Sequence, residues 1–172
     1  HTITDVIGYN CYPGWYGGNT SGFTKMVEKF HALRPEKPLL ISEYGAGSDK
    51  RIHSLSPVSF DFSMEYQPEY IFDYLQTIDA RTWIIGSSAW LLNDFGSEIR
   101  DESMPRINNK GIVYMNREKK DVYYLYKARY EKIKPFVHIA TRDWSKRLVW
   151  PQTTTLGFYI YSNQPIVQVS IN

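Results

Sequence analysis

Several features that would point to particular classes of protein are missing from this sequence of 172 residues. The single cysteine, Cys11, cannot form an internal disulfide and has no second thiol for a zinc site, and it leaves the redox compartment open. The longest apolar run, Trp83 to Leu92, is interrupted by glycine and serine, and it is far shorter than the roughly 20 residues that span a bilayer. The sequence therefore predicts neither a disulfide scaffold nor a membrane-spanning helix.

The charged and potentially reactive side chains do not form a recognisable motif either. The net charge is +2 and no block of like charges occurs, so we expect no nucleic-acid partner and no anionic membrane partner. The serines lack a Gly-x-Ser-x-Gly context, and Gly45-Ala-Gly47 lacks the lysine and hydroxyl residue of a phosphate loop. Histidines are scattered along the chain without helical pairing. We expect neither a metal nor a bound cofactor.

Aromatic residues are the class in excess. They make up 16% of the chain, with 14 Tyr and 5 Trp. Such a content suits either a heavily packed core or a surface that stacks on sugar rings.

The order of apolar and amphipathic segments predicts an α/β fold. Short apolar strands are expected over residues 5–10, 39–43 and 83–92. Helices are expected from Thr20 or Ser21 to Pro35, over 64–80 and over 121–132, where apolar residues recur at three- and four-residue steps. Strands that alternate with helices pair in parallel, because the helix returns the chain to the same end of the sheet.

The chain changes character after Pro135. Residues 136–140, 147–150, 156–161 and 166–171 are short β-type segments separated by proline, asparagine and serine, which is typical of antiparallel strands. Residues 93–110 are expected to form a polar loop. The sequence therefore predicts an α/β unit over residues 1–134, followed over residues 135–172 by the start of an antiparallel β-sandwich.

Polar residues stand where the predicted parallel strands end. Asn10 and Tyr12 follow the first strand, Glu43 ends the second, and Trp90 and Asp94 follow the third. The carboxyl ends of parallel strands are where α/β proteins collect their functional groups. A carboxylate that ends an apolar strand must be neutralised, paired or used. For Glu43, spacing alone favours a surface ion pair over a catalytic role.

Five motifs in fixed order resemble glycoside hydrolase family 2, the family of β-galactosidases, β-glucuronidases and β-mannosidases. They are Asn10-x-Tyr12 with Gly14-Trp15-Tyr16, Ser42-Glu-Tyr-Gly45, Glu65-Tyr-Gln67, Trp90 with Asp94-Phe95, and Asn108-x-Lys110-Gly-Ile112. The resemblance implies a retaining β-glycosidase with Glu43 as nucleophile and Tyr12 as the residue that orients it. It also implies six substrate-binding residues, which are Asn10, Trp15, Trp90, Asp94, Asn108 and Lys110.

The resemblance also implies a larger enzyme. The family's acid/base is the Glu of an Asn-Glu dipeptide, which this sequence lacks, and the chain begins at His1 without a methionine. We expect an excised piece with about strands six to eight of a (β/α)8 TIM barrel, inactive alone. Its expected partners are a carbohydrate and the N-terminal part of the same polypeptide, and a homo-oligomer is left open. Members of this type suggest a bacterial periplasmic or secreted protein.

Three alternatives stay open at this point. The substrate is a galactoside or a glucuronide, and the surroundings of Asn108-x-Lys110 favour the galactoside. A second class is a sugar-binding module without catalysis, for which Trp144 and Trp150 are the main support. A third is a structural piece whose exposed barrel edges pair with another chain.

Overall fold

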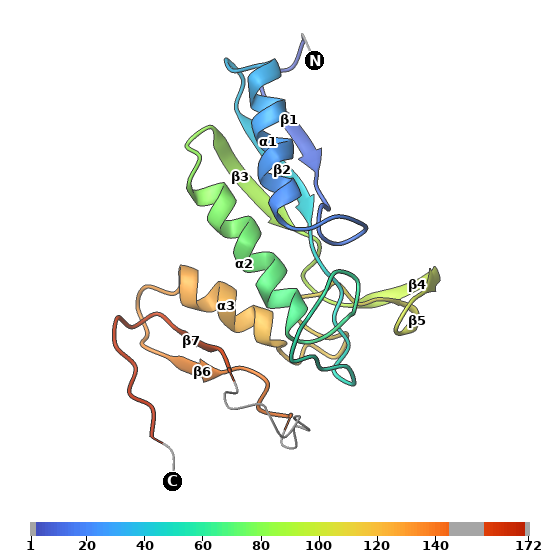
Figure 1. Ribbon diagram of the computed structural model, residues 1–172, viewed down its shortest axis with the longest axis vertical. Helices are drawn as coiled ribbons and strands as arrows, with labels where there is room; N and C mark the ends of the chain where they lie inside the picture. The colour runs from blue at the N-terminus through green and yellow to red at the C-terminus, as the bar shows by residue number, and fades with distance from the viewer. Residues whose placement is uncertain (1–2, 145–156, 171–172) are drawn as a thin grey trace.

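The computed structural model describes residues 3–144 and 157–170 (Figure 1). A parallel sheet in the order β1-β2-β3 is formed by Ile7–Asn10, Leu39–Tyr44 and Ile84–Ala89. Helix α1 (Ser21–Leu33) joins β1 to β2, and helix α2 (Tyr66–Asp79) joins β2 to β3. The predicted α/β alternation is confirmed, and each connection is long enough to bring the chain back to the same end of the sheet.

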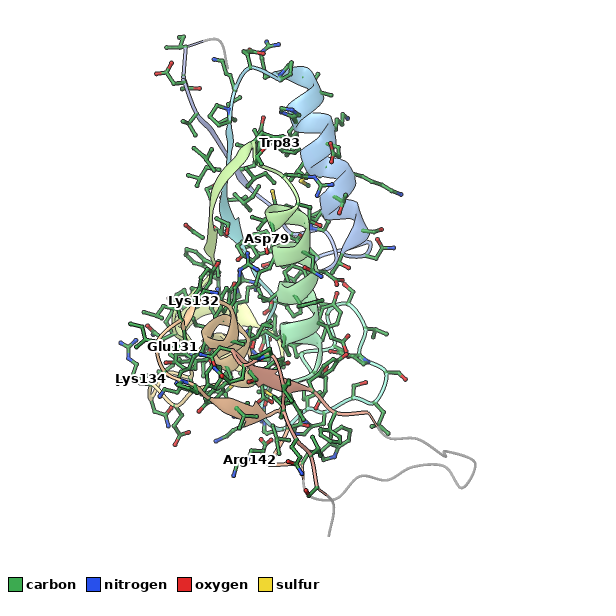
Figure 2. The ribbon with its side chains drawn as sticks, turned by 90° about the vertical axis from the view of Figure 1, so that its left-hand side faces the viewer. Asp79, Trp83, Glu131, Lys132, Lys134 and Arg142 are labelled. Carbon is green, nitrogen blue, oxygen red and sulfur yellow. The ribbon has the colours of Figure 1, made fainter. Side chains whose placement is uncertain are left out.

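Helices α1 and α2 lie along one face of this sheet (Figures 1 and 2). Alternate strand residues point into that layer, because successive side chains of a strand face opposite ways. The buried set includes Ile7, Leu39, Ile41 and Ile84 from the strands, with Phe23 and Val27 from α1 and Tyr70, Ile71 and Tyr74 from α2. On the other face Ile85 is 58% exposed. Within the described residues, β1 and β3 each keep one unpaired edge.

Stacked aromatic rings form the centre of the helix layer. The Phe23 and Tyr74 rings are parallel, with centroids 3.9 Å apart, and Tyr44 and Tyr70 stack on Tyr74 at 5.3 Å and 4.4 Å. Each such pair adds about 0.5–1.5 kcal/mol beyond the burial of its surface. Much of the aromatic excess therefore serves packing.

Helix α3 (Asp121–Tyr130) packs beside α2. Arg129 pairs with Asp79 at the end of α2, which Figure 2 labels, and the Tyr126 and Tyr44 hydroxyls are 2.9 Å apart. The helix ends at Tyr130, two residues before the predicted end, where Glu131 is already extended. None of the helices in the described ranges is long and apolar enough to cross a membrane.

The segment 93–110 is not the plain polar loop that the sequence predicts. It contains the antiparallel hairpin of β4 (Phe95–Asp101) and β5 (Pro105–Asn108), which projects from the sheet in Figure 1. Its strands are mostly exposed, so they lack the apolar alternation by which a strand is recognised in sequence. Strand β3 also ends at Ala89, three residues before the predicted Leu92.

The tail contains one antiparallel pair, β6 (Val137–Ile139) with β7 (Ile160–Ser162), beside α3. Asp121, at the start of α3, bonds His138 Nε2 at 2.7 Å and the backbone N–H of Thr141 at 2.8 Å. Two of the four predicted tail strands thus exist in shortened form. The prediction for 166–171 is wrong over the described residues 166–170, which are irregular and exposed, and 147–150 lies outside the described residues.

The buried tyrosines generate a prediction about alkaline pH. Burial raises the pKa of Tyr70, Tyr74 and Tyr126 above the ordinary value, so these hydroxyls stay protonated in the fold. Above about pH 10 the unfolded chain releases protons that the folded chain retains, and the free energy of unfolding falls by up to about 1.4 kcal/mol per pH unit per group. Urea unfolding from about pH 8 to about pH 11 measures this slope.

The matched variant is Tyr70→Phe, because the hydrogen bond from the Tyr70 hydroxyl to the Cys11 carbonyl oxygen is long, at 3.5 Å. It removes one titrating group and keeps the ring, so the slope above pH 10 becomes shallower. A stability that does not change across this pH range would contradict the prediction.

Candidate active site

The Glu43 carboxylate lies between two hydrogen-bond donors from the neighbouring strand. Tyr12 donates its hydroxyl to Oε1, and Asn10 Nδ2 donates to Oε2 at 3.0 Å. Ser42 Oγ in turn donates to Asn10 Oδ1 at 2.9 Å, which fixes the orientation of the amide. Both carboxylate oxygens are therefore held in place by neutral donors.

Strand pairing produces this arrangement. Asn10 is the register partner of Glu43 in the parallel pair β1–β2, after an irregularity between Tyr9 and Asn10. The pairing continues beyond the strand, because the Cys11 N–H donates to the Glu43 carbonyl oxygen at 2.7 Å. The pairing thus brings together Asn10 and Glu43, which the sequence analysis placed at two strand ends. Tyr12 lies two residues after Asn10, and its hydroxyl reaches the same carboxylate.

Tyr12 is a permanent hydrogen-bond donor to Glu43. Burial and the hydrogen bond to Glu43 raise the pKa of the Tyr12 hydroxyl far above its ordinary value, so it stays protonated at any physiological pH. The alternative for Glu43, a surface ion pair, is not what the structure contains: among the described residues, no lysine, arginine or histidine forms a salt bridge with it. A carboxylate held by two neutral donors can act as a nucleophile.

Trp90 lies at the end of β3, next to the strand that carries Glu43. Its N–H donates to the Tyr44 carbonyl oxygen at 2.7 Å, and its side chain is partly exposed. A Cβ on Gly45 would lie 2.1 Å from the Trp90 carbonyl oxygen, so only glycine permits this close approach of the two loops. The ring is available for contact with a ligand.

Lys110 is a buried cation with an unused head group. It is 2% exposed, and its Nζ has no hydrogen-bond partner among the described residues. The Nζ lies 5.2 Å from the Trp15 ring centroid and 5.1 Å from that of Tyr16. Asn108, which is also buried, accepts the Lys110 N–H through its Oδ1 at 3.3 Å. Burying an ammonium group without an acceptor is costly, and an anion bound beside it would offset that cost.

Trp15 does not have the role that the sequence predicts. Its side chain is fully buried in a cluster with Phe60, Phe62 and Tyr66, so it forms the wall behind Lys110 and cannot itself contact a sugar. The ring that faces outward in this motif is Tyr16, which is 53% exposed. Apolar aromatic residues in a loop give no sequence signal that separates the buried ring from the exposed one.

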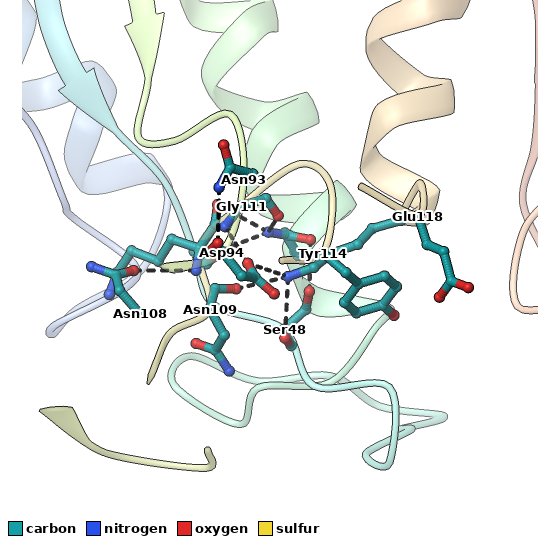
Figure 3. A network of polar contacts seen from close by, with 12 residues as sticks. Ser48, Asn93, Asp94, Asn108, Asn109, Gly111, Tyr114 and Glu118 are labelled. Atoms are coloured by element: carbon teal, nitrogen blue, oxygen red, sulfur yellow. Dashed lines mark hydrogen bonds and ion pairs between the residues drawn. The ribbon is translucent and has the colours of Figure 1, made fainter. Parts of the chain in front are cut away.

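Asp94 is likewise a structural residue and not a substrate ligand. It is 2% exposed, and its Oδ1 accepts Lys120 Nζ at 2.9 Å and the Gly111 N–H at 2.8 Å (Figure 3). Lys120 Nζ also reaches the Asn109 carbonyl oxygen at 2.9 Å. Burial lowers the pKa of Lys120 and raises that of Asp94, and the ion pair opposes both shifts. Sequence reasoning missed Lys120 because nothing local links it to Asp94.

The described residues contain no group of three or more His, Cys, Asp or Glu side chains placed to hold a metal ion. The histidines with acidic partners, His53 with Glu65 and His138 with Asp121, form isolated pairs. Each pair joins neighbouring segments of the fold.

The ends of the parallel strands thus carry a carboxylate held by two donors and a partly exposed tryptophan, and the buried Lys110 ammonium has no hydrogen-bond partner in the described part of the chain. The comparisons give the class: residues 1–135 match "Glycosyl hydrolases family 2, TIM barrel domain". The chain belongs to glycoside hydrolase family 2.

Named relatives are β-glucuronidases. The chain is 30% identical to the β-glucuronidase of Bacteroides fragilis over 99% of its own length and 25% of that protein. It is 53% identical to the crystal structure of a Bacteroides uniformis β-glucuronidase, with a TM-score of 0.80, over 83% of this chain and 17% of that one. An FMN-binding β-glucuronidase from Faecalibacterium prausnitzii L2-6 gives 41% identity and a TM-score of 0.87, over 95% and 25%. The chain thus spans about a quarter of these relatives, or less.

The buried ion pair yields a prediction about stability. Lys120→Met leaves the Asp94 carboxylate buried without its counter-ion, and the free energy of unfolding falls by about 3–5 kcal/mol. In the double variant Asp94→Asn with Lys120→Met neither member of this pair is charged, so most of that loss is recovered. Urea unfolding of the three proteins measures both changes.

The control is the more exposed pair between Arg81 and Glu28. Glu28→Gln changes stability by no more than about 1 kcal/mol, because exposed pairs are screened by solvent. The assignment of Asp94 as structural fails if Lys120→Met is as stable as the wild-type protein.

Proposed function

We propose that this chain is part of a retaining β-glucuronidase in which Glu43 is the nucleophile and Lys110 binds the carboxylate of the sugar. The observation that carries the catalytic role is the Glu43 carboxylate at the end of β2, with one donor on each oxygen. The observation that supports the sugar is the buried ammonium of Lys110, which has no hydrogen-bond partner within residues 3–144 and 157–170.

The chain supplies one portion of the barrel in this proposal. Residues 1–134 form about strands six to eight, the N-terminal part of the same polypeptide forms the remaining strands, and residues 135–172 begin a β-sandwich domain. Three parallel strands in sequential order, with an unpaired edge at each side, support this arrangement. The antiparallel pair β6–β7 supports the change of architecture after the barrel.

The reaction uses Glu43 in two steps. One Glu43 oxygen attacks the anomeric carbon, the bond to the leaving oxygen breaks, and a carboxylic acid about 5 Å away protonates that oxygen. The same acid, now a carboxylate, then removes a proton from a water molecule. This water attacks the anomeric carbon, so the ester bond to Glu43 breaks and the Glu43 carboxylate is released. Tyr12 and Asn10 keep the Glu43 carboxylate oriented toward the anomeric carbon, which reduces the reorganisation needed to reach the transition state. The acid is supplied by the longer protein, since this chain has no Asn-Glu dipeptide.

The choice of a glucuronide replaces the galactoside that the sequence favours. A galactoside has no charge with which to neutralise Lys110, whereas a uronate carboxylate forms a charge-assisted hydrogen bond there. The three relatives described above carry the name β-glucuronidase, which supports the same choice. A binding module without catalysis has no use for a carboxylate that two donors orient, so the glycosidase is the function that we propose.

Replacing the nucleophile tests the catalytic role. In the longer protein, Glu43→Gln removes the attacking charge and keeps the shape, so turnover of an aryl β-glucuronide falls by several orders of magnitude. A 2-fluoro glycoside of the same sugar labels the wild-type peptide that contains Glu43, which mass spectrometry detects. Glu118→Gln, at an exposed position, is the matched control and retains activity. Wild-type turnover by Glu43→Gln would refute the assignment.

Replacing the buried lysine tests the substrate. Lys110→Met keeps the length of the side chain and removes its charge, so kcat/KM for an aryl β-glucuronide falls about 10–100-fold, while that for the matched β-galactoside does not fall. Lys119→Met removes a charge from an exposed position nearby and leaves both rates unchanged. If the galactoside is the better substrate of the wild-type protein, the glucuronide proposal is wrong.

A further inference from the structure

The β4–β5 hairpin has no role in the proposed reaction so far, yet one of its side chains reaches the candidate site. Arg100 Nη1, from β4, donates to the Tyr16 hydroxyl oxygen at 3.2 Å and to Glu102 Oε1 at 2.8 Å. Tyr16 is the exposed ring over which the Lys110 ammonium lies. The hairpin thereby touches the group that stands beside the unpartnered cation.

We propose that Arg100 is a specificity-determining positioning residue, which orients the Tyr16 hydroxyl so that its hydrogen is donated to the anionic group bound at Lys110. The inference rests on the proposed function and adds a residue to it. Arg100 acts through Tyr16 and is not assigned any contact with the reacting atoms.

The chemistry of a phenol explains why such a donor matters. A tyrosine hydroxyl has one hydrogen and can accept as well as donate, so in isolation its hydrogen rotates to suit any neighbour. A guanidinium has no acceptor, so Arg100 occupies the oxygen as a donor and leaves the hydrogen for another partner. The hydrogen bond from a cation also polarises the hydroxyl, which strengthens the bond that it donates onward.

Arg100 is held in place from two sides. The bond to Glu102 fixes the guanidinium, and the hydrogen bonds to Tyr16 and Glu102 raise the pKa of Arg100, so the charge is permanent. The turn of the hairpin is anchored at Ser103, whose carbonyl oxygen accepts Arg51 Nη2 at 2.7 Å and whose Oγ accepts Asn109 Nδ2 at 2.8 Å. Asn109 is next to Lys110 in sequence, so the anchor joins the hairpin to the loop of the buried lysine.

The aromatic rings extend this link to the nucleophile. The Tyr16 ring lies 5.2 Å from the Tyr12 ring, and Tyr12 donates to Glu43. A substrate that extends from Glu43 to Lys110 therefore lies along two tyrosines, and in this proposal their hydroxyls form hydrogen bonds at opposite ends of the site. Tyr12 serves the nucleophile, and Tyr16 serves the anionic group.

The test is a double-mutant cycle between Arg100 and Tyr16 in the longer protein, with 4-nitrophenyl β-D-glucuronide and 4-nitrophenyl β-D-glucoside. Arg100→Gln raises KM for the glucuronide about 3–10-fold and leaves kcat nearly unchanged, because the contact is equal in the ground state and the transition state. The rate on the glucoside, which has no carboxylate, does not change. In a Tyr16→Phe background, Arg100→Gln has no further effect, since the hydroxyl that it orients is absent.

Arg106→Gln is the matched control, because Arg106 is an exposed arginine of the partner strand β5 and its loss changes the net charge equally. Isothermal titration with D-glucuronate and with D-glucose gives the same comparison without turnover. Arg100→Gln weakens the binding of glucuronate and not of glucose.

The inference is overturned if Arg100→Gln affects both substrates alike, if Arg106→Gln has the same effect, or if the effects of Arg100→Gln and Tyr16→Phe simply multiply. Failure of the proposed function has a different signature, which is a Lys110→Met protein that keeps its wild-type activity on the glucuronide. A protein that responds to Lys110→Met and not to Arg100→Gln refutes only the role of Arg100.

Discussion

One buried ammonium group, the Nζ of Lys120, connects the loops on which the candidate site depends. It bonds Asp94 from the loop after β3 and the Asn109 carbonyl oxygen from the loop after β5, and it reaches Ser48 in the loop after β2 at 3.4 Å. These bonds give the buried ammonium group acceptors from three separate loops. Lys120 therefore holds the loop that follows the strand of Glu43 and the segment that contains Lys110 in one arrangement.

The parts of the fold that the sequence reveals are those with a local cause. Strand β2 is recognisable because an apolar run ends in Glu43, and α1 because Phe23 and Val27 recur at helical spacing. The pairing of Asn10 with Glu43 follows from two parallel strands that end together. These features need only neighbouring residues and the rule that parallel strands share an end.

The parts that sequence reasoning misses depend on distant contacts. Asp94 and Lys120 are 26 positions apart, and only the folded chain brings the carboxylate to the ammonium. The burial of Trp15 depends on Phe60 and Phe62 from another loop. The β4–β5 hairpin has no apolar face by which its strands could be recognised in the sequence. The motif Asn108-x-Lys110 does not decide between sugars by itself, whereas the observation that the Lys110 ammonium has no partner among the described residues does bear on that question.

The short segment from Asn10, at the end of β1, to Tyr16 has a consequence for how this family can diversify. Its first residues touch the carboxylate of Glu43, and its last residue lies over the ammonium of Lys110. Under the proposed function, the residues that orient the nucleophile and the ring beside the charge-binding lysine thus fall within seven consecutive positions of one segment. An insertion or deletion there shifts both at once. Changes in the β4–β5 hairpin or in the Asn108–Lys110 segment leave Glu43 in place, so we expect specificity for other sugars to arise there.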